Sequence, residues 1–280
     1  MVKKAGERTM ICNARIKGFM IKKFLIIMAM LCVASGAMGY NSEHGPFADN
    51  VKFKQITLTP LSREPKVENI SETCSNFVFA VGGVDARSVF VNQRDNSFLV
   101  SVTVAGRQVL PPSEFSDFGF FELGLEAFSD DLNQDGVVDF IVYSSSGGCG
   151  LAGGYCNIAF ILSANDKYTI TTVTTLFPDK SDFVIINKKP CFIHTAFAYV
   201  DQCNDGKNHN FWIYQLLAFG KDGVTIDNSI HDGFPKTVYY TFKPNHAETT
   251  IITTEQKATL WKQATSEVYW KKDYEQQSDR

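Results

Sequence analysis

The sequence predicts a mainly β protein built from antiparallel sheets, with one amphipathic helix near the C-terminus. Short runs rich in β-branched and aromatic residues recur along the chain, as in residues 97–104, where Phe98, Val100, Val102 and Val104 fall on one face of a strand. Turn dipeptides separate these runs, and no helical period appears before residue 253. Repeated units of strand, turn and strand are typical of antiparallel sheets.

Nine runs have the composition and length of strands. They are residues 97–104, 139–143, 156–162, 168–176, 182–187, 191–200, 211–219, 223–227 and 237–242. Three Asp-Gly dipeptides suit the positive φ of hairpin turns, at Gly136, Gly206 and Gly223.

The one predicted helix begins near Thr253. Thr253 followed by Gln256 is a capping-box pattern, in which each side chain bonds the other residue's backbone N–H. One face of the helix is apolar at helical spacing, and we expect that face to pack on a sheet. It comprises Leu260, Trp261, Ala264 and Val268.

Residues 1–39 are predicted to be an export signal. Lys22 and Lys23 precede an apolar stretch of about ten residues, and Ala37 and Gly39 fit the small positions of a cleavage site. The stretch is too short to span a bilayer, and the natural start can be Met20, with residues 1–19 as an upstream extension. Residues 40–72 read as an irregular entry segment and residues 73–280 as a single β-rich domain. We therefore expect a periplasmic or extracellular protein with no membrane span after the signal is removed.

The charge balance argues against nucleic acid as a partner. Residues 1–40 hold seven Lys and Arg against Glu7 alone, so their net charge is +6. Because the whole chain carries −3, the remainder carries −9. An acidic protein is a poor match for phosphate backbones, so the expected partner is a protein or a glycan.

Five cysteines remain after residue 40. In an oxidising compartment the sequence favours two local disulfides, Cys149 with Cys156 and Cys191 with Cys203. Cys74 is left over, either as a buried thiol or as a partner that would change this assignment.

The stretch from Phe128 to Tyr143, FSDDLNQDGVVDFIVY, gathers oxygen ligands around a tight turn. Its pattern D-x-N-x-D-G-x-x-D places ligands at alternating positions, and Gly136 permits the sharp bend. Carboxylates this close repel one another unless a cation lies between them, so the spacing predicts a Ca²⁺ site. Its ligands would be Asp131, Asn133, Asp135, the Val137 carbonyl and Asp139. A solvated Asp/Asn/Gly turn without metal is the alternative.

The loop is not an EF-hand, because position 12 is Val142 instead of Glu and an apolar strand follows. Without that Glu the expected dissociation constant is about 10⁻⁴ to 10⁻³ M. The loop resembles the calcium-binding turn of FG-GAP and VCBS repeats, the integrin-like propeller motifs. That resemblance implies Ca²⁺ at these five residues, pinning a β-hairpin. A propeller would need the loop to recur in several blades, but it occurs once, so we do not predict a propeller. The following segment, with Cys149 and Cys156, is similar to a C-G-x-G-G-C element of small exported bacterial proteins, so the resemblance covers about residues 128–160.

Other motifs favour structural roles. Residues 201–209 imitate the calcium pattern, but Cys203 stands at the third position, so a hairpin turn is predicted there. His194 lies in a predicted strand and is expected to be a core residue in preference to a general base. Catalytic residues are not recognisable. The sequence therefore favours an exported calcium-binding protein with a binding or structural role, and leaves open an envelope hydrolase, built on Asp130, Glu126 or His194, or an inhibitor of a secreted enzyme.

Overall fold

The fold is described from a computed structural model of the 280-residue chain. The structure describes residues 53–64, 74–81, 87–94, 97–116, 125–145, 154–164, 167–239 and 251–268. The predicted signal at 1–39, Cys74's side chain and Cys149 lie outside what can be described, so the predictions for them stay predictions.

Three antiparallel sheets make up the described chain, and the prediction of a mainly β fold is confirmed. Sheet A has the order β1-β12-β13-β14-β15, and β16 pairs with the first half of β14, from Phe211 to Tyr214. Its strands are Lys54–Gln55 (β1), Phe183–Ile186 (β12), Lys189–Val200 (β13), His209–Gly220 (β14), Gly223–Ile226 (β15) and Lys236–Tyr239 (β16).

Sheet B has the order β11-β10-β9-β8-β2, and sheet C the order β3-β4-β5-β6-β7. Within the described residues these sheets form neither a closed barrel nor a propeller. The strands of sheet B are Thr59–Pro60 (β2), Leu125–Asp130 (β8), Asp139–Ser145 (β9), Tyr155–Ala164 (β10) and Lys167–Leu176 (β11). Those of sheet C are Ser62–Glu64 (β3), Cys74–Val81 (β4), Arg87–Arg94 (β5), Ser97–Val104 (β6) and Arg107–Ser116 (β7).

Sheet B is buried on both faces. One face packs on sheet C, where Phe140 and Ile161 meet Val100 and Val102. The other face packs on sheet A, where Phe160 contacts the rings of three phenylalanines. Strands covered on both sides read as continuous apolar runs, which explains the composition of β9 and β10. The two interfaces follow the alternation of side chains along each strand.

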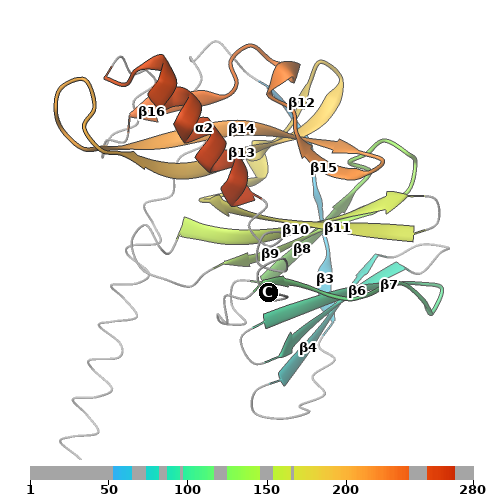
Figure 1. Ribbon diagram of the computed structural model, residues 1–280. Coiled ribbons are helices and arrows are strands. Elements are labelled where there is room, and N and C mark those ends of the chain that lie inside the picture. Colours follow the sequence, from blue (N-terminus) through green and yellow to red (C-terminus); the bar gives the residue numbers. More distant parts are fainter. Residues whose placement is uncertain are drawn as a thin grey trace, which may run out of the picture. The chain divides into compact units, whose positions relative to one another are not determined.

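Helix α2 (Thr254–Val268) covers the inner face of the β13–β14 hairpin beside the edge of sheet B (Figure 1). The predicted capping box is present: Thr253 N–H donates to Gln256 Oε1 at 2.9 Å, and Gln256 N–H donates to Thr253 Oγ1 at 3.1 Å. Leu260 and Ala264 are buried against the hairpin, as their spacing predicts.

The entry segment differs from its prediction. Residues 53–64 were expected to be irregular, yet β1, β2 and β3 each add a short strand to a different sheet. Lys54 pairs with Ile185, Thr59 with Ser129 and Ser62 with Ala80. This segment therefore links all three sheets within eleven residues.

The predicted Cys191–Cys203 disulfide is wrong. Both residues are free thiols, and each is buried in a different apolar cluster. Cys191 lies near the start of β13, whereas Cys203 follows its end at Val200. The strand between them spans about 30 Å at about 3.3 Å per residue. A disulfide requires Cα atoms about 4.4–6.8 Å apart. Cys156 is also a free thiol, while its predicted partner Cys149 lies outside the described residues.

Candidate metal loop and buried polar groups

Residues 131–138 connect β8 to β9, so the predicted calcium loop closes a β-hairpin of sheet B. Two residues of the loop have positive φ, Gln134 at 60° and Gly136 at 84°. No atom lies within 4 Å of the place where a side chain on Gly136 would begin, so backbone conformation alone favours glycine there. The bend that the sequence predicts is present.

Asp139 is the buried anchor of the loop. Its Oδ2 accepts the backbone N–H groups of Leu132 at 2.8 Å and Asn133 at 3.1 Å, and its Oδ1 accepts that of Ser163 at 2.7 Å. Burial raises the pKa of this carboxyl to about 6, against the opposing effect of the three hydrogen bonds. Asp139 therefore ties both ends of the loop to strand β10.

The other carboxylates turn back onto the loop itself. Asp131 accepts the N–H of Asp135 at Oδ1 and of Gly136 at Oδ2, each at 3.0 Å. Asn133 Oδ1 also accepts from Asp135 N–H, at 3.1 Å, and Asp135 Oδ1 accepts the Val137 N–H at 2.8 Å. These contacts fold the loop around the side-chain oxygens at positions 1, 3 and 5.

Ser163 on β10 fixes the open side of the loop. Its hydroxyl donates to Asp135 Oδ2 at 2.7 Å, and its carbonyl accepts from Asn133 Nδ2 at 2.7 Å. Tyr168 adds a third tie by donating its hydroxyl to the Val138 carbonyl at 2.8 Å. The sequence pattern did not reveal Ser163 or Tyr168, because both are far from the loop along the chain.

The loop brings Asp131, Asn133 and Asp135 together at its surface but holds Asp139 beneath it. Asp135 is exposed, Asp131 and Asn133 are half-buried, and Asp139 has no exposed surface. No three His, Cys, Asp or Glu residues in the described part of the chain are grouped so that they could hold a metal ion. A metal bound here would have to draw on the Asn133 amide and a backbone carbonyl such as that of Val137, besides the two outer carboxylates.

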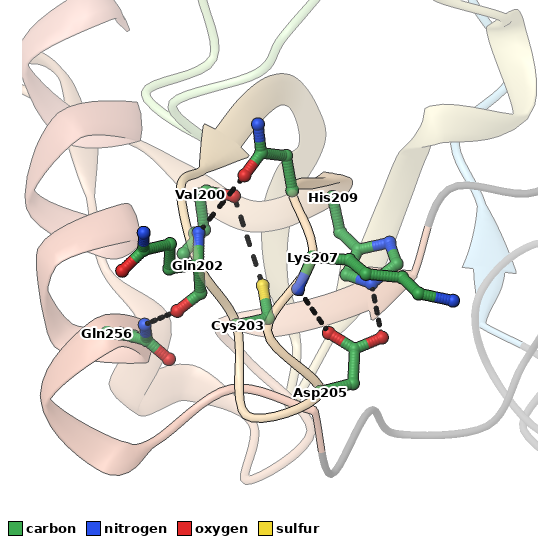
Figure 2. Close-up of polar contacts among 8 residues, drawn as sticks. Val200, Gln202, Cys203, Asp205, Lys207, His209 and Gln256 are labelled. Carbon is green, nitrogen blue, oxygen red and sulfur yellow. Dashed lines mark hydrogen bonds and ion pairs between the residues drawn. The ribbon is translucent and has the colours of Figure 1, made fainter.

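The second acidic loop, residues 201–208, joins β13 to β14 and is the hairpin that the sequence predicts. Asp205 of this loop accepts the Lys207 N–H at 3.0 Å and contacts His209 Nε2 at 2.8 Å (Figure 2). The hydrogen bond to His209 lowers the pKa of Asp205. The loop also touches α2, because Gln256 Nε2 donates to the Gln202 carbonyl at 3.3 Å.

A buried histidine lies where sheet A, sheet B and α2 meet. His194 on β13 has no exposed surface, as its position in a strand predicts, and its Nε2 is 2.7 Å from the Thr174 carbonyl on β11. Its neighbour across the strand pair is Gln215, also fully buried. His194 Nδ1 and Gln215 Oε1 have no hydrogen-bond partner among the residues that the structure describes. Burial lowers the pKa of His194 to about 4.

A second acid with a raised pKa, the half-buried Asp182, closes the short 3-10 helix Lys180–Asp182. Its Oδ2 accepts the Asp179 N–H at 2.8 Å, and burial raises its pKa to about 7. Nearby, the Tyr143 hydroxyl is buried without a hydrogen-bond partner, and its ring packs edge-on against Phe128 at 5.5 Å. Burial, with Asp182 among the neighbouring acids, raises the pKa of Tyr143.

Comparison with known proteins identifies no similar family model, curated protein or solved structure. Among the described residues there is no helix both long and apolar enough to cross a membrane. The geometry of the chain itself is therefore the basis for a functional proposal.

Proposed function

We propose that this protein is an exported calcium-binding β protein with a binding or structural role at the cell envelope or outside the cell. The observation that supports it is the inward fold of loop 131–138, with oxygens from Asp131, Asn133 and Asp135 around one turn. The N-terminal sequence, with its basic residues, short apolar run and small residues, supports export.

Hydrogen bonding within the loop leaves acceptor positions of its side-chain oxygens available to a cation. An ionised carboxylate has about four acceptor positions. Asp131 uses one at each oxygen for backbone N–H groups. A divalent ion can take the remaining lone pairs without breaking the turn, and its charge would offset repulsion between Asp131 and Asp135.

Asp139 would support the ion in a different way. Three backbone N–H groups occupy its carboxylate, so we assign it the role of holding the loop in place while Asp131 and Asp135 supply the charge. A site with two outer carboxylates, an amide and backbone carbonyls binds Ca²⁺ weakly, so we expect a dissociation constant of about 10⁻⁴ to 10⁻³ M. Such affinity suits the calcium-rich surroundings of an exported protein.

Isothermal titration of the chelator-treated protein with Ca²⁺ tests the proposal. We expect one site in the wild type and loss of binding in Asp131→Asn, since the amide removes the negative charge and one of the two acceptor oxygens. Asp205→Asn is the matched control, because Asp205 lies in a similar acidic turn that we assign no ion. The proposal is wrong if saturating Ca²⁺ gives no heat and leaves the melting temperature unchanged, or if Asp205→Asn abolishes binding instead.

The role as a binding protein rests on the acidic charge of the chain after residue 40 and on the absence of a recognisable catalytic motif in the sequence. The partner would be a protein or a glycan. Pull-down experiments from envelope extracts with and without Ca²⁺ test this, and calcium-dependent recovery of one partner is the expected result.

A further inference from the structure

The junction of His194 and Gln215 has two buried hydrogen-bond acceptors and, among the residues that the structure describes, no donor for them. Nε2 of His194 faces a carbonyl oxygen, which can only accept, so Nε2 carries the proton and Nδ1 has a lone pair. Gln215 Nε2 points to the Trp261 carbonyl at 3.5 Å, so Oε1 is the end left without a partner. Both side chains are fully buried, which makes each unmade hydrogen bond costly.

This junction also includes contacts between α2 and the sheets. Gln215 reaches the Trp261 carbonyl, and the Trp261 indole Nε1–H donates to Thr237 Oγ1 on β16 at 2.9 Å. On the other side, His194 satisfies a carbonyl on β11, the edge strand of sheet B. A change at His194 therefore acts on the contact between α2, β11 and the β13–β14 hairpin.

Within the described part of the chain, the groups that face His194 are uncharged. They are Thr174 on β11, Gln215 on β14 and, beyond it, Trp261 on α2. Of the charged residues of α2 whose burial the structure describes, Glu255 and Lys262 are exposed and Lys257 is half-buried. No carboxylate contributes to the pKa of His194, which burial sets and the hydrogen bond to Thr174 opposes. A proton added to Nδ1 would place an unpaired charge in a dry site.

We propose that His194 is an acid-sensitive latch for α2, whose protonation loosens the helix from the β13–β14 hairpin while the interface of sheets B and C stays intact. Release would uncover the apolar residues beneath the helix, among them Ala198, Phe211 and Ile213. The latch does not depend on calcium or on loop 131–138.

The docked and released states of α2 bind a proton at His194 with different affinity, so docking depends on pH. In the released state that we propose, the contact with Thr174 also opens and water reaches His194, which then has its ordinary pKa of 6.5, whereas in the docked state its pKa is about 4. Docking is therefore fully favoured above pH 6.5 and weakens as pH falls toward 4, by about 100-fold in the docking equilibrium.

Hydrogen exchange followed by mass spectrometry tests the latch on the full chain. After correction for intrinsic rates, exchange of residues 253–268 should rise by about 100-fold between pH 6.5 and 4, while exchange of strand β10 changes little. In His194→Gln, which keeps a donor for Thr174 and cannot titrate, this rise should disappear. His231→Gln is the control, because that ring packs on Phe53 and Phe234 away from α2.

Gln215→Glu gives a second test that keeps His194. A carboxylate opposite the ring stabilises its charged form, so the rise in α2 exchange from pH 6.5 to 4 should shrink, even though loss of the donor to the Trp261 carbonyl raises exchange at both pH values. The proposal is overturned if α2 and β10 lose protection together, if His194→Gln keeps the wild-type pH dependence, or if NMR titration of His194 in the folded protein gives a pKa of 6.5 or above. The NMR titration decides the question if His194→Gln does not fold.

Discussion

The carboxylate of Asp139 accepts the backbone N–H of Ser163 at 2.7 Å, although the two residues are 24 positions apart in the chain. Asp139 opens strand β9, and Ser163 lies near the end of β10. With two further N–H groups from the loop on its other oxygen, this carboxylate connects the turn to the centre of sheet B. A residue that the sequence marks as a ligand thus has a structural role of its own.

Asp139→Asn should lower the free energy of unfolding by about 2–4 kcal/mol, because the amide turns one acceptor into a donor facing backbone N–H groups. Burial raises the folded pKa of Asp139 from 3.8 to about 6. The stability that this shift contributes is present below pH 3.8 and is lost as pH rises through 6. Urea unfolding of the two proteins from pH 4 to 8 measures both effects. A loss under 0.5 kcal/mol would contradict the anchoring role.

Phe160→Ala should destabilise the protein by about 3–5 kcal/mol, since it opens a cavity between sheets A and B. The Phe160 ring lies 5.5 Å from that of Phe192 and 5.2 Å from that of Phe219, measured between centroids. Tyr199→Ala is the control, because the Tyr199 side chain is 48% exposed and should change stability by less than about 0.5 kcal/mol. Equal effects of the two changes in thermal unfolding would argue against this packing.

Thr253→Ala should lower the free energy of unfolding by about 1 kcal/mol, because it removes the hydroxyl that caps α2. Thr265→Ala is the matched control. The Thr265 hydroxyl donates to the Trp261 carbonyl within the helix, and its removal should leave the free energy of unfolding nearly unchanged. Denaturant unfolding compares the two variants. The capping assignment fails if Thr265→Ala is the more destabilising change.

The sequence predicts the fold where local signals and burial agree. Residues 97–104 place Phe98, Val100, Val102 and Val104 on one face and form β6 with those bounds, and the glycines of the Asp-Gly dipeptides, Gly136, Gly206 and Gly223, all have positive φ. Strands β1 to β3 give no such signal, because two or three residues have no period to read. They form through pairing with distant residues, as in Lys54 with Ile185.

The sequence predicts the local turn of the candidate site but not the contacts that its residues make with other strands. Alternating oxygens around Gly136 predict the turn, because a loop of this kind is fixed by neighbours in sequence. The partners of Asp139 and His194 lie on other strands, at Ser163 and Thr174, and no pattern within either segment indicates them. The predicted Cys191–Cys203 pair is wrong for a related reason. The two cysteines are close in sequence, but most of the twelve-residue strand β13 lies between them and holds them apart in space.

Cys191 and Cys203 should behave as independent buried thiols. Burial raises the pKa of Cys191 to about 11 and that of Cys203 above its ordinary value, so both should react slowly with thiol reagents in the folded protein and readily in urea. Because the two lie in separate clusters, the losses of stability in Cys191→Ala and Cys203→Ala should add within about 0.5 kcal/mol in the double variant. A disulfide predicts the opposite: each single change would remove the same bond, and the second would cost little more. Denaturant unfolding of the three variants distinguishes these outcomes whatever the state of Cys149 and Cys156.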